Sequence, residues 1–275
     1  MEVNIYKIHP ALRDIVCNIS TVNAVLPPHL PQVVTPYPPT AFQSLMFYCN
    51  HPIKMGKVEE KIFLKQPRSL IIGPQYSRVN VVVEEALQAI RVDFLPGGLY
   101  RLLGIPMHEL FDLGVDATAI LGGMVNDLNE RLRNISKLEE GKNMVENFLL
   151  ERAKRCREIL PIDFALLNLM QSQGIMPMDK MAEMACLSLK QFERKCKERI
   201  GMNPKTYSRI LKFSKAYRMH EVNPAMSWTK IAHASGYYDQ MHMIRDFKLF
   251  AGTNPTHIEK QLLRTPLRMQ KDLLL

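Results

Sequence analysis

A 17-residue segment near the C-terminus, Ser188-Leu-Lys-Gln-Phe-Glu-Arg-Lys-Cys-Lys-Glu-Arg-Ile-Gly-Met-Asn-Pro204, has a second copy 51 residues later. The second copy reads Asp239-Gln-Met-His-Met-Ile-Arg-Asp-Phe-Lys-Leu-Phe-Ala-Gly-Thr-Asn-Pro255. Arg, Lys, Gly, Asn and Pro recur in register, which indicates that one structural unit is used twice. Each copy follows a short helical stretch and a tight break, the pattern of a helix-turn-helix. We therefore expect two such units and double-stranded DNA as their partner.

The positive charge of the chain is concentrated around this repeat. The whole sequence of 275 residues carries a formal net charge of +9 at pH 7. Residues 160–275 hold 18 Lys and Arg against 10 Asp and Glu, whereas residues 1–159 hold 18 against 17. A basic region that also carries the repeat is the electrostatic footprint of a nucleic-acid binder. Charge alone leaves open a solvated cationic surface without a ligand.

On a helical wheel the first copy separates an apolar stripe from a polar face. Such a helix can pack by its stripe and turn the polar face into the major groove. Arg and Lys suit guanine or phosphate, and Glu suits cytosine. Ser188 and Gln191 also have the spacing of a capping box, which would occupy Gln191 with the backbone. The stripe is formed by Leu189, Phe192, Cys196 and Ile200. The candidate DNA-binding residues are Lys190, Gln191, Glu193, Arg194 and Lys197.

The second copy repeats this arrangement, with Asp239 as the expected N-cap. Arg245 aligns with Arg194, which favours both as groove contacts, and phosphate attraction is the simpler role for Lys197 and Lys248. The supporting helices are expected at 179–185 and 229–235. The buried side of the second copy is expected to hold Met243, Phe247 and Phe250. Its candidate DNA-binding residues are Gln240, Met241, His242, Arg245 and Lys248.

Residues 1–115 are predicted to form a β-rich domain. Short runs rich in β-branched and aromatic residues are separated by turn formers. Within the last run, alternation indicates a single buried face. Six prolines between Pro27 and Pro39 exclude a central strand and predict a surface loop or lid there. The expected strands cover 42–48, 69–72, 79–83 and 86–94, and a short helix is expected at 99–103.

Residues 116–159 are predicted to form a helical connector. Apolar residues recur at helical spacing near 118–134 and 138–158. The connector could form a homodimer surface or pack on its own N-terminal domain, and the sequence does not choose between them. A third region, 160–265, follows with Pro161 at a first helical turn.

The third region resembles the DNA-binding domain of AraC-type (AraC/XylS) bacterial transcriptional regulators. The matching segments are 188–194, 201–207, 231–237, 239–242, 245–248 and 252–255. The resemblance implies two helix-turn-helix subdomains joined by a long helix, expected at 205–220, and transcription regulation. Cys186 departs from the family's turn glycine, Cys196 from its aromatic residue, and Met241 and Met243 from a small and a bulky apolar residue.

The N-terminal region resembles, less specifically, the cupin-like sensor barrels of such regulators. Residues 94–104, Pro106 and 109–112 carry this likeness. The implied fold class is α+β, with a β-barrel sensor, a helical connector and an all-α DNA-binding domain. The resemblance adds a small-molecule effector of unknown identity and RNA polymerase as candidate partners. The sequence does not distinguish activation from repression.

An enzyme with an appended DNA-binding module, of the metal-dependent cupin or DNA-repair type, is the competing class. His9, His29, His51 and His108 include no closely spaced pair. The five cysteines have no metal-ligand spacing either. We therefore expect no catalytic residue, no metal and no cofactor. The start lacks a signal-peptide pattern and no apolar run has the length of a membrane span, so we expect a cytoplasmic protein without a membrane partner.

Overall fold

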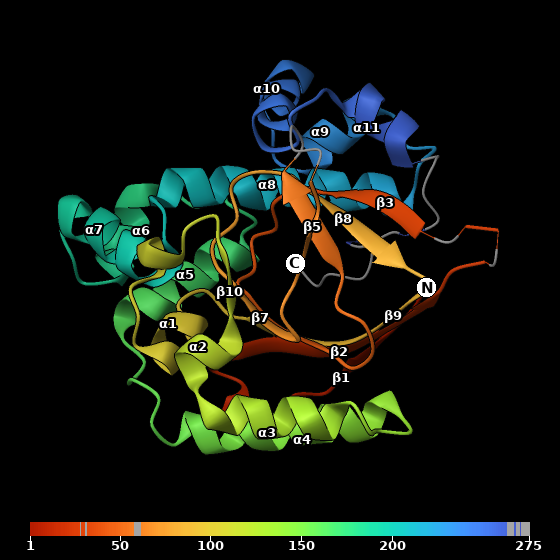
Figure 1. The fold of residues 1–275 in the computed structure, drawn as a ribbon. Coiled ribbons are helices and arrows are strands. Elements are labelled where there is room, and N and C mark those ends of the chain that lie inside the picture. Colours follow the sequence, from red (N-terminus) through yellow and green to blue (C-terminus); the bar gives the residue numbers. More distant parts are fainter. Residues whose placement is uncertain (28, 31, 58–61, 263–266, 268–269, 271–275) are drawn as a thin grey trace.

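The fold combines a β-rich N-terminal part with a helical C-terminal part, as predicted (Figure 1). A computed structural model describes residues 1–27, 29–30, 32–57, 62–262, 267 and 270. Within these residues, no helix is long and apolar enough to cross a membrane. The α+β fold class is confirmed.

Two antiparallel sheets form the N-terminal part and enclose an apolar core. Leu70 of one sheet and Val81 of the other are among the buried residues between them. The first sheet has the strand order β1 (Glu2–Tyr6), β2 (Val16–Val25), β9 (Ala86–Phe94), β4 (Ser44–Tyr48), β7 (Ser69–Ile72) and β10 (Gly114–Asp116). The second has the order β3 (Gln32–Tyr37), β8 (Val79–Glu84), β5 (Lys54–Lys57) and β6 (Leu64–Lys65).

The proline-rich segment corrects one prediction, because part of it is a strand and not a loop or lid. β3 pairs with β8 from Gln32 opposite Glu84 to Tyr37 opposite Val79. It contains Pro36, which cannot donate a backbone hydrogen bond. β3 is the end strand of its sheet and is bonded on one side only. An edge position tolerates proline, so the exclusion of a central strand holds while the prediction of a loop was wrong.

β9 is buried on both faces, whereas alternation predicted one. Its residues from Ala89 to Phe94 are all buried. The inner face looks into the barrel, and helix α4 (Leu138–Ala153) covers the outer face. A Cβ at Gly141 of α4 would lie 2.8 Å from Ile90 Cδ1. A strand covered by a helix on one side and a sheet on the other loses the one-sided pattern.

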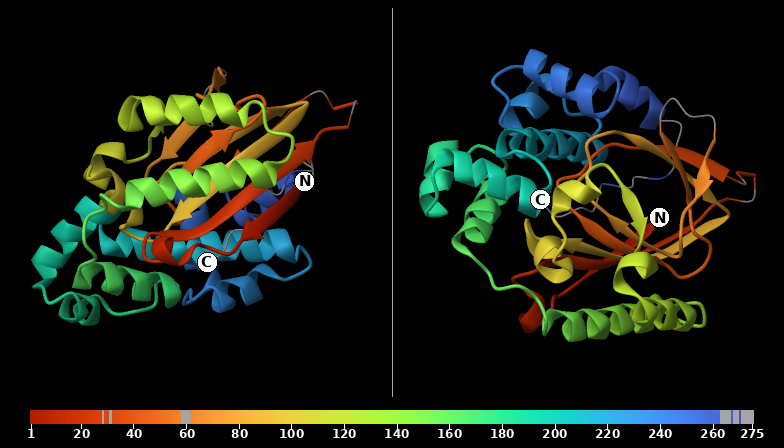
Figure 2. Two further views of the ribbon diagram at one scale, coloured as in Figure 1. Left: turned by 90° about the horizontal axis from the view of Figure 1, so that it is seen from below. Right: turned by 60° about the vertical axis from the view of Figure 1, so that its left-hand side comes forward.

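The connector helices pack on the barrel of their own chain. Helices α2 (Ala117–Leu121) and α3 (Gly123–Leu132) precede α4, and Phe148 of α4 meets Phe47 of β4 with ring centroids 6.4 Å apart. Figure 2 shows α3 and α4 on the side of the barrel away from α9, α10 and α11. Packing on the N-terminal domain is thus one role of this segment, and dimerisation through it stays a prediction.

Short helices at one end of the barrel face the C-terminal part. The predicted helix after the last long strand is α1 (Gly98–Leu103), accompanied by the 3-10 helices η1 (Pro10–Leu12) and η2 (Met107–Leu110). Both α1 and η2 contact α7. The barrel therefore touches a predicted recognition helix directly.

The C-terminal helices form two groups joined by α8, as expected. α8 is longer than predicted: its 19 residues span about 28 Å at 1.5 Å per residue. Its predicted stripe residues Tyr207, Ile210, Leu211, Ser214 and Tyr217 are all buried. The helices are α5 (Pro161–Gln171), α6 (Met178–Met184), α7 (Leu189–Ile200), α8 (Pro204–Val222), α9 (Trp228–Ala234), α10 (Gln240–Phe250) and α11 (Pro255–Leu262).

Two described residues beyond α11 contact the barrel. The Leu267 side chain is buried in the apolar cluster between the sheets. The Gln270 side-chain amide donates to the Pro38 carbonyl at 2.6 Å. The barrel and the C-terminal part are thus joined at several places along the chain.

Candidate nucleic-acid interface and ligand cavity

Helix α7 begins with the predicted capping box. The Ser188 backbone N–H donates to Gln191 Oε1 at 3.0 Å, and the Gln191 N–H donates to Ser188 Oγ at 3.3 Å. Phe192, Cys196 and Ile200 are buried beneath the helix, whereas Leu189, in the first turn, is 49% exposed. The Gln191 side chain is therefore engaged at the helix start, which is the alternative role that the spacing indicated.

The polar face of α7 borders an open basic groove. Lys190, Arg194 and Lys197 are exposed, and Glu193 is half-buried. The opposite side of the groove belongs to the start of α8, whose residues are not among the predicted DNA-binding residues. These additional lining residues are Asn203, Lys205, Thr206 and Arg209. Lys205 directly follows the Asn-Pro pair that recurs in both copies. Its place beside the repeat is the sequence signal that could have identified it as a groove residue.

Arg209 forms its side-chain hydrogen bonds with the second helix-turn-helix unit. Its Nε and Nη2 atoms donate to Asp246 Oδ1 at 3.0 and 2.6 Å. The Tyr237 hydroxyl donates to Asp246 Oδ2 at 3.1 Å, and burial together with the Asp246 carboxylate raises the pKa of Tyr237. The three side chains fix α10 to α8. Arg209 therefore positions the second predicted recognition helix as well as bordering the groove of the first.

Helix α10 exposes Met241, His242, Arg245 and Lys248, with Met241 58% exposed. Met243, Phe247 and Phe250 are buried, as predicted. Asp239 caps the helix, since the His242 backbone N–H donates to its Oδ1 at 2.8 Å. The His242 Nδ1 atom lies 2.9 Å from the same oxygen, and the hydrogen bonds from the His242 backbone and side chain lower the Asp239 pKa.

Some predicted site residues already have partners in the structure. Gln240 Oε1 accepts from the Thr229 hydroxyl at 2.9 Å, and His242 is engaged with Asp239 as described. Arg194 and Arg245 are exposed at aligned positions of α7 and α10. The structure thus separates side chains that organise the helix starts from those that face solvent.

The two turns have the same backbone conformation although only one contains glycine. Gly236 has φ +78°, and Cys186 has φ +54°. The first unit thus keeps the turn geometry with a side chain in the left-handed region, which glycine adopts at lower cost. The departure at Cys186 leaves the helix-turn-helix shape unchanged.

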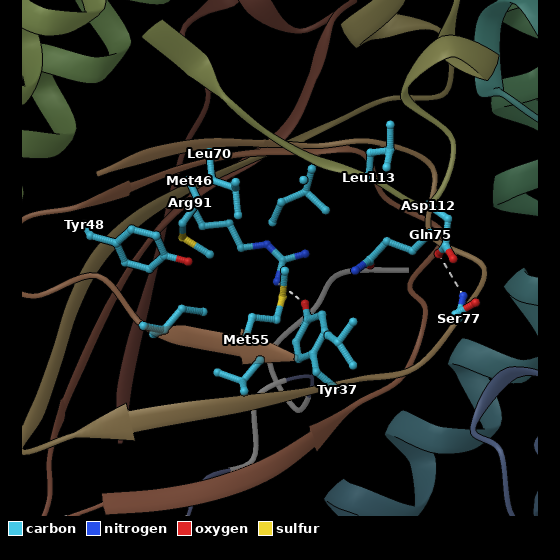
Figure 3. A pocket seen from close by; sticks show the side chains of 15 residues that line it. Tyr37, Met46, Tyr48, Met55, Leu70, Gln75, Ser77, Arg91, Asp112 and Leu113 are labelled. Atoms are coloured by element: carbon cyan, nitrogen blue, oxygen red, sulfur yellow. Dashed lines mark hydrogen bonds between the residues drawn. The ribbon is translucent and has the colours of Figure 1, made fainter. Parts of the chain in front are cut away.

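A cavity lies between the two sheets of the barrel (Figure 3). Its free volume is about 80 Å³. Met46, Met55, Leu70 and other apolar side chains line most of it. Gln75, Ser77 and Asp112 lie together at one end (Figure 3). Apolar walls with a few polar groups are typical of sites for small molecules.

Arg91 and Asp112 are the only charged residues lining this cavity within the described chain. Arg91 Nε donates to Asp93 Oδ1 at 2.7 Å, Nη1 to the Tyr37 hydroxyl at 2.6 Å and Nη2 to Ser44 Oγ at 3.2 Å. Burial opposes the charge of the guanidinium, but Asp93 and Tyr37 more than offset this and raise the Arg91 pKa. The cation is thus neutralised by its own neighbours.

The comparisons with known proteins identify the C-terminal part. Residues 181–261 match a family model described as a helix-turn-helix domain. This chain carries an AraC-type DNA-binding domain. It is a DNA-binding transcriptional regulator, as the repeat predicted. Residues 5–116 match a model described as a domain of unknown function (DUF6597).

Solved structures of two proteins are similar to this chain. ToxT from Vibrio cholerae O395 has 10% sequence identity over 86% of this chain and 99% of that chain, with a TM-score of 0.45. A second structure of ToxT from Vibrio cholerae, in a P21 crystal form, has 11% identity over 88% and 98%, with a TM-score of 0.48. The AraC-like activator CuxR has 9% identity over 75% and 84%, with a TM-score of 0.25. No curated protein sequence matches.

The described residues contain no group of three His, Cys, Asp or Glu side chains that could hold a metal ion. Burial raises the pKa of the Cys17 thiol to about 11 and that of Cys49 to about 12. Alkyl transfer needs a thiolate, which these surroundings disfavour. The Cys17 and Cys49 thiols are therefore poor candidates for alkyl transfer.

The cysteines provide a test of this burial. In the native protein we expect iodoacetamide at pH 7.5 to modify exposed Cys186 first, and Cys17, Cys49 and Cys196 at least about tenfold more slowly, because burial disfavours their thiolates. Mass spectrometry of peptides after timed quenching measures each rate. Denaturation in urea should equalise the rates. Fast modification of Cys17 or Cys49 in the folded protein would contradict the expectation.

Proposed function

We propose that the AraC-type domain binds an asymmetric operator of two adjacent elements, with α7 reading one and α10 the other. The observation that carries this is the pair of exposed arginines, Arg194 and Arg245, at aligned positions of the two helices. A rigid α8 of about 28 Å suits recognition helices that enter successive major grooves.

The candidate residues then divide by role. Arg194 and Arg245 read bases, assisted by Lys190, Glu193 and Met241. Lys197, Lys248 and the additional residue Lys205 attract phosphates. The remaining candidates, which have partners within the protein, orient the starts of the two helices. These are Gln191, Gln240 and His242.

We expect Arg194→Ala and Arg245→Ala each to weaken operator binding by about 1–3 kcal/mol and to relax specificity at one element. The loss arises because a bidentate contact to a base edge disappears. Selection of bound sequences from a random duplex library by the full chain identifies the operator. Fluorescence anisotropy on the operator and on a scrambled duplex then measures each variant.

Lys197→Ala is the matched control on the same face of α7. It should weaken the operator and the scrambled duplex alike and reduce the salt dependence of binding, because it removes one phosphate contact. Equal losses of the arginine variants on both duplexes would contradict the base-reading role. Uniform, salt-sensitive binding with no enriched sequence would contradict the two-element operator itself.

The barrel cavity supports a second part of the proposal, that a small molecule bound there modulates the regulator. The cavity favours a neutral, mainly apolar molecule, because Asp93, Tyr37 and Ser44 already satisfy the nitrogens of Arg91. A carboxylate ligand would find no free cation among the described lining residues. Gln75 and Ser77 can orient a hydroxyl or carbonyl group.

Paired probes test the charge of the ligand. Thermal denaturation is measured with decanol and with decanoate, which differ only in the end group. A ligand that binds the folded state raises the melting temperature. Decanol should raise it at sub-saturating concentrations and decanoate should not. A stronger response to decanoate would contradict the neutral ligand.

Binding of the protein to RNA polymerase and formation of a homodimer stay predictions.

A further inference from the structure

One loop, residues 73–78, contacts both the barrel cavity and the two predicted recognition helices. It joins β7 to β8 and runs without regular secondary structure. Residues in an extended chain point alternately to opposite sides. Of this segment, Gln75 and Ser77 line the cavity, and Val79 at the start of β8 continues the row. Figure 3 shows Gln75 and Ser77 beside Asp112 at one end of the cavity.

The intervening residues face the DNA-binding domain. Pro74 lies against Gly201, the residue that ends α7, because a Cβ added there would be 2.3 Å from Pro74 Cγ. The ring of Tyr76 meets that of Phe250, the last residue of α10, edge to face with centroids 5.5 Å apart. The loop thus touches the C-terminal ends of both recognition helices.

Arg78 adds a polar contact to the same helix end. Its side chain is only 8% exposed, and its Nη1 atom donates to the Ala251 carbonyl at 3.2 Å. Ala251 is the C-cap of α10. Nη1 also donates to Gln261 Oε1 of α11 at 3.1 Å. A buried guanidinium holds the carbonyl at the end of a helix more firmly than an exposed one would.

The loop is itself held by a cavity residue. Asp112 Oδ1 accepts hydrogen bonds from the backbone N–H groups of Tyr76 and Ser77, both at 2.9 Å. The Asp112 backbone N–H donates to the Pro74 carbonyl at 2.8 Å. Asp112 has φ +57° and lines the cavity. A ligand that displaced Asp112 would therefore move the residues that touch the helices.

We propose that loop 73–78 couples occupancy of the barrel cavity to the placement of both recognition helices. This rests on the proposed function, since it supplies the route by which a molecule in the cavity changes operator binding. Alternate side chains give the loop one row toward the ligand and one toward α7 and α10. Small shifts of the first row are passed to the second by the backbone between them.

A double-mutant cycle tests the coupling without a known ligand. Met55→Trp replaces a linear side chain of the cavity wall by a bulkier indole ring and serves as the probe of occupancy. We expect it to change the dissociation constant for the selected operator by about fivefold or more. In the Tyr76→Leu and Arg78→Gln variants, adding Met55→Trp should change this dissociation constant by less than about twofold, because the contacts between the loop and α10 are then broken. Tyr76→Phe keeps the ring and should behave as the unmodified chain.

The outcomes separate the two proposals. An effect of Met55→Trp that persists unchanged in both loop variants would overturn the coupling and leave modulation through the cavity standing. No effect of Met55→Trp in the otherwise unmodified, folded chain would overturn modulation through the cavity, and the coupling with it. Circular dichroism and thermal denaturation establish folding for every variant. If Tyr76→Leu does not fold, Arg78→Gln decides.

Discussion

Asp93→Leu is expected to lower the free energy of unfolding by about 3–5 kcal/mol, since it leaves the buried Arg91 cation without its counterion. The Arg91 Nε and Asp93 Oδ1 atoms are 2.7 Å apart, and the two side chains are only 7% and 1% exposed. Ser44 Oγ also donates to this carboxylate oxygen. Urea denaturation followed by circular dichroism measures the loss. The double variant Arg91→Met/Asp93→Leu should regain part of it, because neither charge is then buried.

Glu84→Leu is the matched control, because it breaks an ion pair of similar length at the surface. Lys54 Nζ lies 2.6 Å from Glu84 Oε1, with side chains 38% and 46% exposed. Water screens this pair, so we expect a loss of about 1 kcal/mol or less. Equal losses for Asp93→Leu and Glu84→Leu would show that the Arg91 charge reaches solvent. The neutralisation of Arg91 by its neighbours, and with it the proposal of a neutral ligand, would then lose its basis.

The sequence predicted the DNA-binding domain well because its signals are local. The capping box of Ser188 and Gln191 and the cap at Asp239 each join residues three apart, and both are present in the structure. The buried stripe of α8 follows helical spacing along one segment. Such patterns depend on neighbours in the chain and can be read without knowing the rest of the fold.

The parts that were wrong or missing depend on contacts between distant residues. Pro36 was compatible with a strand only because β3 is the end strand of its sheet. The two-sided burial of β9 needs α4 on its outer face, and no pattern within β9 shows that helix. Arg78 and Ala251 are 173 positions apart. The contacts of loop 73–78 therefore required the structure.

Gly201→Ala and Gly252→Ala should have different costs, although the two glycines occupy equivalent positions of the repeat. Both lie in the left-handed region, with φ +76° and +67°. Nothing lies within 4 Å of a Cβ at Gly252, so we expect about 1–2 kcal/mol there from backbone strain alone. A Cβ at Gly201 would also be 2.3 Å from Pro74 Cγ and 2.9 Å from the Met107 carbonyl oxygen. Overpacking should raise its cost to about 2–5 kcal/mol.

The difference between these two variants isolates the contact of the barrel with α7. The backbone term is shared, so any excess for Gly201→Ala belongs to Pro74 and Met107. Urea denaturation of both variants measures that excess. Equal costs would mean that Pro74 gives way freely, and a loop that gives way there could not transmit movement to the end of α7. An excess confined to Gly201→Ala would establish a rigid junction at the first recognition helix, which the coupling through loop 73–78 requires.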